Sequence, residues 1–100
     1  MWVISRKKLI EAAEQHGDLG GALDAWYKIT KQARWTNIND VRVVFSTADA
    51  AGDCTVFKIK GNNYRLITWI NYKTHKVFIR RVLTHAEYDK EEWKNDCYGA

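Results

Sequence analysis

Three apolar segments separated by two short turns restrict the fold of this chain more than any other feature. In the first segment Lys58 and Lys60 alternate with apolar side chains, the period of a β-strand with one apolar and one basic face. The links 61–63 (Gly-Asn-Asn) and 73–75 (Lys-Thr-His) have the length and residue types of tight turns. The predicted antiparallel strands are TVFKIK (55–60), YRLITWINY (64–72) and KVFIRRVL (76–83).

Two helices are expected before these strands. Ser5 can cap a first helix that continues to about His16, and Gly17 fits its end. A second helix opens at Asp18 or at the glycines that follow. Its apolar residues recur at helical spacing and should form the core with the apolar faces of the strands. They are Ala22, Leu23, Trp26, Ile29 and Ala33.

A third helix is predicted directly after the last strand. Thr84-x-x-Glu87 is a capping box, in which each residue satisfies a backbone N–H of the other. The helix should run to about Asn95 and bring His85, Tyr88 and Asp89 onto one face. The predicted fold is therefore α+β, one domain over residues 1–100. Two N-terminal helices pack on an antiparallel sheet of three or four strands, and a short helix follows.

The positive charge is concentrated in one block. Residues 1–53 hold seven Lys/Arg and seven Asp/Glu, and residues 87–100 hold two and five. Residues 54–86 hold seven Lys/Arg and no carboxylate, which favours a polyanionic partner over a mixed solvated face. Outside the candidate catalytic residues, the cations of this block that we expect to bind this polyanion are Lys58, Lys60, Lys73, Lys76 and Arg81.

His85 and its neighbours are the candidates for chemistry. The positive end of a helix dipole disfavours an imidazolium, so His85 could accept a proton while Asp89 orients its ring. The plain alternative is a surface histidine. Arg65 and Arg80 lie on predicted strands, where an arginine is costly unless it is paired or faces a ligand. The alternative is that each side chain extends to the sheet edge. Alternation does not decide whether Arg80 or Arg81 faces the cleft.

Other classes of site are poorly supported. Nucleotide-binding glycine loops, zinc-protease motifs and paired carboxylates for a metal are missing, so neither metal nor cofactor is expected. Cys54 and Cys97 match no zinc spacing and are expected to be reduced thiols. The N-terminus lacks the apolar stretch of a signal peptide, and no apolar segment is long enough for a bilayer. A cytoplasmic protein without membrane partners is therefore expected.

From about Val41 onward, the chain resembles the HigB toxins, a RelE-like branch of bacterial toxin–antitoxin systems. The resemblance is carried by NDVRVVF, FKIKGNNYRLI, VFIRRVLTHAEYD and EEWK, and the R-x-V-L-T-H-x-E-Y-D motif is the most specific part. It implies a RelE-like fold and a ribonuclease toxin that cleaves mRNA, typically on the translating ribosome. It also implies a helix-turn-helix antitoxin similar to HigA, and contact with operator DNA only through the toxin–antitoxin complex.

The resemblance places the family's function on five residues of this chain: Arg65, Arg80, His85, Tyr88 and Asp89. The expected reaction is metal-independent attack of the RNA's own 2′-OH on the adjacent phosphate. His85 or a lysine of the first predicted strand would assist proton transfer, with Asp89 orienting His85. Arg65 and Arg80 would stabilise the phosphate charge. Tyr88 would stack on or orient the nucleotide.

Two other functions remain open at this point. ParE-like proteins share the fold, poison DNA gyrase and need no acid–base cluster, so His85 with Tyr88 favours the nuclease. A noncatalytic RNA-binding module would use the basic block alone.

Overall fold

The computed structural model describes residues 1–98, which form a five-stranded mixed sheet with helices on both faces. The strands lie in the order β1-β5-β4-β3-β2, and all neighbours are antiparallel except β1 and β5. The elements are β1 (Trp2–Ile4), α1 (Arg6–Gln15), α2 (Gly20–Gln32), α3 (Ile38–Val44), β2 (Asp49–Ala51), β3 (Cys54–Ile59), β4 (Tyr64–Asn71), β5 (Lys76–Thr84), α4 (His85–Asp89) and α5 (Lys94–Cys97).

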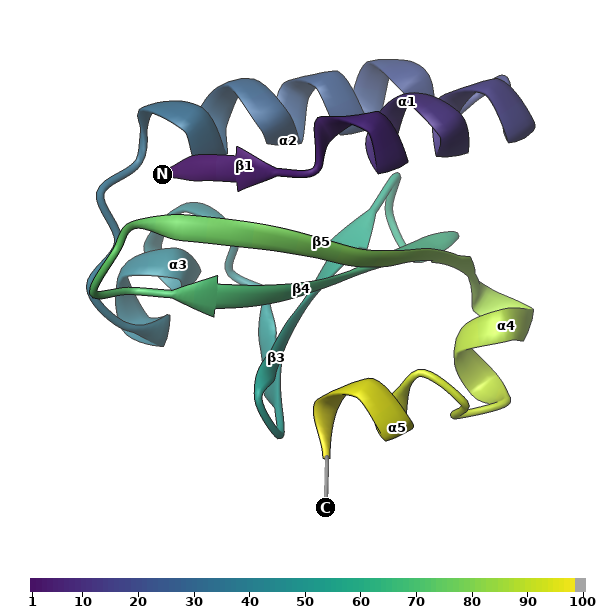
Figure 1. The fold of residues 1–100 in the computed structure, drawn as a ribbon. Coiled ribbons are helices and arrows are strands. Elements are labelled where there is room, and N and C mark those ends of the chain that lie inside the picture. Colours follow the sequence, from purple (N-terminus) through teal and green to yellow (C-terminus); the bar gives the residue numbers. More distant parts are fainter. Residues whose placement is uncertain (99–100) are drawn as a thin grey trace.

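Figure 1 shows α1 and α2 side by side above the sheet, with α4 and α5 on the opposite side. We call this opposite side, away from α1 and α2, the open face, because α4 and α5 cover only one end of it. The predicted α+β architecture is confirmed, as are the three hairpin strands. The sheet has two further strands, β1 and β2, and it is mixed rather than antiparallel. With three residues each, these strands are too short to show a hydrophobic period.

The main core lies between α1, α2 and the sheet. Trp26 of α2 is 2% exposed and meets the ring of Phe57 edge-on, with the ring centroids 5.3 Å apart. Leu23 is buried beside it, as predicted. The prediction for Ile29 is wrong, because this side chain is 43% exposed and the next residue, Thr30, is fully buried instead. Both positions fit a helical spacing from Trp26, so the period alone does not separate them.

An extra residue in β5 settles how its two arginines point. Ile67 of β4 lies opposite Arg81, yet the next residue of β4 lies opposite Ile79, so Arg80 has no partner in the ladder. Such a β-bulge interrupts the alternation of side chains. Ile79 and Val82 both pack in the main core, whereas both arginines are exposed. Arg80 and Arg81 therefore both lie on the open face.

A disulfide joins Cys54 at the start of β3 to Cys97 in α5, so the prediction of two reduced thiols is wrong. The carbonyl of Cys97 also accepts a hydrogen bond from the N–H of Asp53 at 2.7 Å. Gly52 makes this approach possible. Its φ is +58°, and a Cβ added there would lie 2.3 Å from the Cys97 oxygen. The bridge holds α5 over a second, smaller core that includes Val56, Ile67, Leu83 and Trp93.

Within the described chain, residues 1–98, no helix combines the length and apolar composition needed to cross a membrane.

Candidate active site

The start of α4 has the capping box that the sequence predicts. The Thr84 hydroxyl accepts a hydrogen bond from the Glu87 N–H at 3.2 Å, and the Glu87 carboxylate accepts one from the Thr84 N–H at 3.0 Å. This second bond is the main reason that the pKa of Glu87 lies below its ordinary value. The two bonds fix the first turn of α4 and with it the position of His85.

The same helix ends earlier than predicted. It stops at Asp89, and Glu91 adopts a φ of +63°, a left-handed conformation that no helix continues through. The prediction of one helix to Asn95 is therefore wrong. The reversal lets α5 fold back under the sheet and bury Trp93 and Cys97. No glycine marks this position in the sequence.

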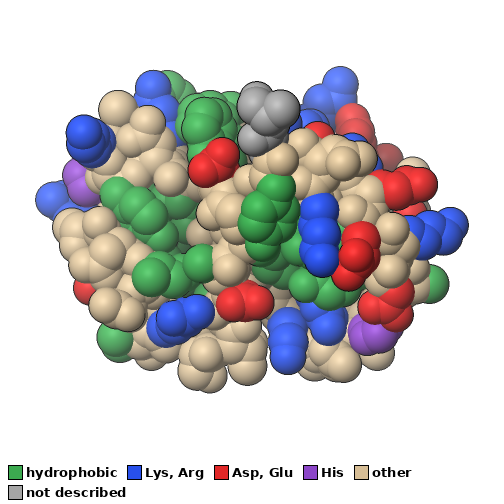
Figure 2. Space-filling view, turned by 90° about the horizontal axis from the view of Figure 1, so that it is seen from below, with side chains coloured by type: hydrophobic (Ala, Val, Ile, Leu, Met, Phe, Trp, Pro, Cys, Tyr) green, Lys and Arg blue, Asp and Glu red, His purple; other side chains and the backbone are tan. Residues whose placement is uncertain are grey.

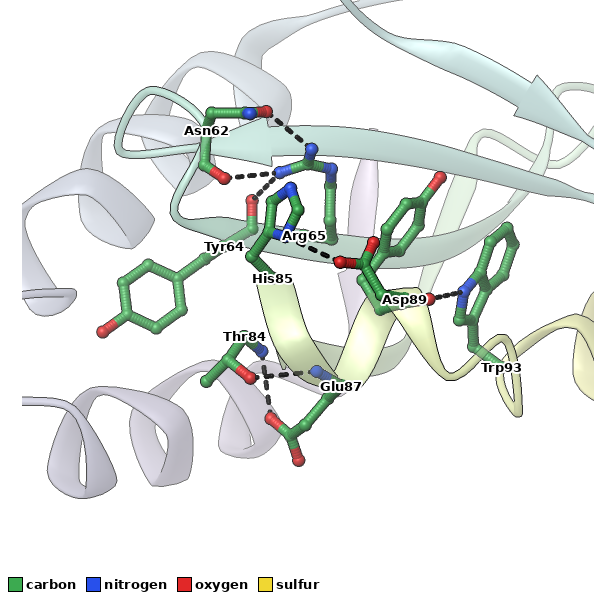
Figure 3. Close-up of polar contacts among 9 residues, drawn as sticks. Asn62, Tyr64, Arg65, Thr84, His85, Glu87, Asp89 and Trp93 are labelled. Atoms are coloured by element: carbon green, nitrogen blue, oxygen red, sulfur yellow. Dashed lines mark hydrogen bonds and ion pairs between the residues drawn. The ribbon is translucent and has the colours of Figure 1, made fainter.

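His85 and Asp89 are in contact across one turn of α4, with His85 Nδ1 3.0 Å from Asp89 Oδ2. The i,i+4 spacing predicts this contact, and both side chains are half exposed or more. When a neutral His85 donates a hydrogen bond from Nδ1–H to the carboxylate, Nε2 keeps a free lone pair. Figure 3 shows both side chains leaving α4 on the side of the strand that carries Arg65. The pair thus offers an oriented proton acceptor near a guanidinium.

Arg65 is a buried cation, only 6% exposed. Its guanidinium donates to the carbonyl of Asn62 at 2.9 Å and to the side-chain oxygen of Asn62 at 2.6 Å. Among residues 1–98, no carboxylate lies within ion-pair distance of it. Burying a charge without a counter-ion is costly even when it is hydrogen-bonded, so an arriving anion would relieve part of that cost.

Tyr88 supports Arg65 from below. The guanidinium lies over the Tyr88 ring at 4.9 Å from its centroid, and Trp93 stacks on that ring at 4.9 Å and 10°. The Trp93 indole also donates to the Tyr88 carbonyl at 2.9 Å. Sequence reasoning missed Trp93, although an aromatic five residues beyond Tyr88 was a visible signal. Stacking of Tyr88 on a base, as predicted, would require one of these neighbours to move.

The two lysines of the first hairpin lie in different surroundings. Lys58 lies directly opposite Arg65 in the β3–β4 pairing and is exposed on the open face. Lys60 lies beyond the end of β3 with a φ of +54°, and its amine contacts the carboxylate of Asp18 at 3.1 Å. This hydrogen bond is the main reason that the pKa of Asp18 lies below its ordinary value. The two lysines therefore do not share the predicted basic face.

The arginines of β5 form a group of their own. Arg81 pairs with Asp96 of α5 at 2.7 Å, and Arg80 lines a cavity of about 190 Å³ with Trp69, Asp53 and Asp96. His85 lies five positions beyond Arg80 in the chain, roughly 16 Å at strand rise. The structure therefore does not bring Arg80 to the His85–Asp89 pair.

Lys73 and Lys76 lie further away, at the turn before β5 and at its first residue. Figure 2 shows the open face with Lys and Arg side chains interspersed among carboxylates. Ion pairs such as Lys94–Glu91 contribute to this mixture. Residues 1–98 contain no group of three His, Cys, Asp or Glu side chains placed to hold a metal ion.

Comparison with known proteins assigns this arrangement to a family. Residues 20–91 match the HigB toxin family, described as the RelE-like toxic component of a toxin–antitoxin system. The chain is 29% identical over 93 residues to the mRNA interferase HigB of Escherichia coli O6:H1 (strain CFT073), covering 90% of each chain. It is 28% identical over 92 residues to the mRNA interferase toxin HigB of Escherichia coli K12, covering 89% of this chain and 88% of the relative. Because the family match runs from α2 to beyond α4 and includes Arg65 and the His85–Asp89 pair, this chain belongs to the HigB family of RelE-like toxins.

Proposed function

We propose that this toxin is an endoribonuclease that cleaves mRNA. The observation that carries the proposal is the His85–Asp89 pair, held by a capping box beside the buried, unneutralised Arg65. A proton acceptor next to a cation suits metal-free cleavage of a phosphodiester by the RNA's own 2′-OH. The similar proteins from Escherichia coli are named mRNA interferases, which supports the same substrate here.

The reaction that this geometry supports begins at the RNA. Nε2 of His85 takes the proton of a 2′-OH, and the freed oxygen attacks the adjacent phosphorus. The bond from phosphorus to the 5′-oxygen then breaks, and that oxygen leaves with a proton from Lys58 or from the protonated histidine. Arg65, with Lys58 opposite it, stabilises the negative charge that builds on the phosphate oxygens. The products are a 2′,3′-cyclic phosphate and a 5′-hydroxyl, and no metal or cofactor takes part.

Arg80 has a different place in this scheme from the one that the resemblance implies. Because it lies roughly 16 Å along β5 from His85, it contacts RNA outside the scissile phosphate. Tyr88 positions Arg65 through the contact with its ring.

The partners follow from the same proposal. The toxin acts in the cytoplasm on mRNA that a ribosome is translating, and an antitoxin similar to HigA neutralises it. Operator DNA is met only through the toxin–antitoxin complex. The antitoxin would offer an acidic or apolar segment to the face that carries Lys58 and Arg65.

A single 2′-deoxy substitution at the cleavage site tests the proposal. The wild-type chain and His85→Ala are each incubated with translating ribosomes on an mRNA that carries or lacks the substitution. We expect no cleavage of the deoxy mRNA, and cleavage by His85→Ala that is slower by roughly two to four powers of ten. The normal product should end in a cyclic phosphate. Equal cleavage of both mRNAs would rule out attack by the 2′-OH. Loss of activity with EDTA while the ribosome stays intact would rule out a metal-free reaction.

The same preparation separates the other two functions. A gyrase poison would block supercoiling of plasmid DNA and leave the mRNA intact. A noncatalytic module would bind RNA without cutting it.

A further inference from the structure

Two tryptophans are exposed on the open face, at the end that α4 and α5 leave uncovered. Trp2 of β1 is 67% exposed and Trp69 of β4 is 47% exposed, while the other three tryptophans are at most 3% exposed. Figure 2 shows hydrophobic side chains exposed on this side, with Lys and Arg side chains around them. Large aromatic side chains left in water commonly mark a binding surface.

The two tryptophans belong to one ordered surface. Lys76, Phe78 and Arg80 alternate along β5 with Val77 and Ile79, which are buried in the main core, so the first three point to the open face. We call the following set the tryptophan platform: Trp2, Trp69, Lys76, Phe78 and Arg80.

Each aromatic ring of the platform has a defined neighbour. Trp69 lies opposite Phe78 in the ladder, with the ring centroids 5.6 Å apart. Trp2 lies opposite Lys76, whose ammonium is 5.5 Å from the ring centroid. Along β5, the ring of Phe78 therefore lies between the cations Lys76 and Arg80. The two tryptophans are two strands and two residues apart, roughly 12 Å at standard sheet spacings.

The strands that carry the platform contain positive charges and no negative ones. The segments that form β1, β4 and β5 contain no Asp or Glu at all. At the border with α5, Asp53 and Asp96 line the cavity next to Arg80. An apolar peptide would cover the rings but leave Lys76 and Arg80 without partners, whereas a nucleic-acid strand satisfies both kinds of group.

We propose that the tryptophan platform binds a single-stranded segment of the RNA, with bases stacked on Trp2 and Trp69 and phosphates held by Lys76 and Arg80. The inference rests on the proposed function, because it deepens it by adding a second contact with the same RNA. Stacking on aromatic rings beside cations is how single-stranded nucleic acids are commonly held. From Lys76 to Thr84, β5 spans about 26 Å at strand rise, so the platform grips RNA beside the cleaved nucleotide. It sets affinity and leaves the chemical step unchanged.

Binding is measured by fluorescence anisotropy with a labelled single-stranded RNA of about ten nucleotides, 2′-O-methylated throughout so that it is not cut. Trp69→Ala and Trp2→Ala should each weaken binding about five- to a hundredfold. Trp69→Phe, which keeps a ring, should bind close to wild type. Ile10→Ala is the matched control, because Ile10 is 50% exposed on α1, on the other side of the sheet. A duplex of the same sequence should bind more weakly, because its bases are already stacked on each other.

Each outcome has one meaning. Trp2→Ala and Trp69→Ala variants that melt with wild-type cooperativity and bind the RNA as tightly as Ile10→Ala overturn the platform. Absence of binding by the wild-type chain overturns it as well. Loss of antitoxin binding with unchanged RNA binding would assign the surface to the antitoxin instead. Cleavage of natural mRNA is assayed separately, so weakened RNA binding in a chain that cuts nothing would support the platform and refute the nuclease.

Discussion

Arg65 rests on Tyr88, with its guanidinium 4.9 Å from the centroid of the tyrosine ring. Trp93 stacks on the same ring, and Trp93 belongs to the segment that the Cys54–Cys97 disulfide ties to β3. The position of the buried arginine therefore depends on a series of contacts that ends in α5. This dependence allows the role of the tyrosine ring to be separated from the role of its hydroxyl.

Removal of the Tyr88 hydroxyl should matter little. Tyr88→Phe keeps a ring beneath Arg65, and we expect its rate of mRNA cleavage to stay within a few-fold of wild type. Tyr88→Ala removes a cation–π contact of about 0.5–2 kcal/mol and an aromatic pair of about 0.5–1.5 kcal/mol. It should therefore cleave poorly and unfold at lower urea concentration. If Tyr88→Phe is as inactive as Tyr88→Ala, the hydroxyl itself takes part in the reaction.

The His85–Asp89 pair should control the rate more than the affinity. His85→Ala is expected to lower the cleavage rate by roughly two to four powers of ten while binding uncleavable RNA normally. Asp89→Asn should also slow cleavage, because an amide can donate to Nδ1 and so favour the wrong tautomer. His16→Gln is the control, since His16 packs on Tyr64 outside the pair. Single-turnover rates on saturating mRNA make the comparison, and a wild-type rate for His85→Ala would refute the assignment.

Lys58 and Lys60 provide a matched pair of cations. Lys58 lies opposite Arg65 on the open face, whereas Lys60 is held by Asp18. Lys58→Ala should weaken RNA binding and reduce the slope of log affinity against log salt by about 0.7. Lys60→Ala should leave both quantities nearly unchanged. Affinities measured across a salt series check this, and equal effects of the two substitutions would contradict the separation of the lysines.

Stability should fall in acid. The pKa values of Asp18, Asp40 and Glu87 lie below their ordinary values, chiefly because of hydrogen bonds from Lys60, from the Thr36 N–H and from the Thr84 N–H, respectively. A lowered pKa means that the carboxylate favours the folded state. This contribution is complete above about pH 4–5 and is lost as the pH falls through the lowered values.

Urea unfolding at a series of pH values measures the effect. The free energy of unfolding should decline below about pH 4, and Asp40→Asn should make that decline shallower. A decline of equal slope in Asp40→Asn would show that this carboxyl does not contribute.

The disulfide should contribute measurably to stability. It closes a separation of 43 residues, for which the chain-entropy estimate is about 4 kcal/mol. Dithiothreitol should therefore lower the urea midpoint of the wild-type chain. The double variant Cys54→Ser/Cys97→Ser should start at the lower midpoint and not respond to the reductant. A wild-type midpoint that dithiothreitol leaves unchanged would contradict this prediction.

Local features of the chain were predictable from the sequence. The period of two in the hairpin strands, the helix limits near Ser5 and His16, and the Thr84–Glu87 box each depend on residues close in sequence. The His85–Asp89 contact follows from one helical turn once the box fixes the start. The RelE-like family assignment is confirmed by the match over residues 20–91.

Contacts between distant segments were not predictable. Cys54 and Cys97 give no spacing signal, because loop geometry decides whether two cysteines meet. The bulge at Arg80 and the reversal at Glu91 lack the glycine that would usually announce them. Thr30 replaces Ile29 in the core although its hydroxyl finds no hydrogen-bond partner among residues 1–98.

Gly52 gives the fold an unusual kind of vulnerability. Any side chain there would collide with the Cys97 carbonyl, at a backbone conformation that other residues rarely adopt. A shift of Cys97 would move α5 and Trp93, and with them the Tyr88 ring on which Arg65 rests. In a genetic selection for cells that survive the toxin, we expect escape substitutions at Gly52 alongside those at His85. A map of such survivors would thus mark a glycine that has no chemistry of its own.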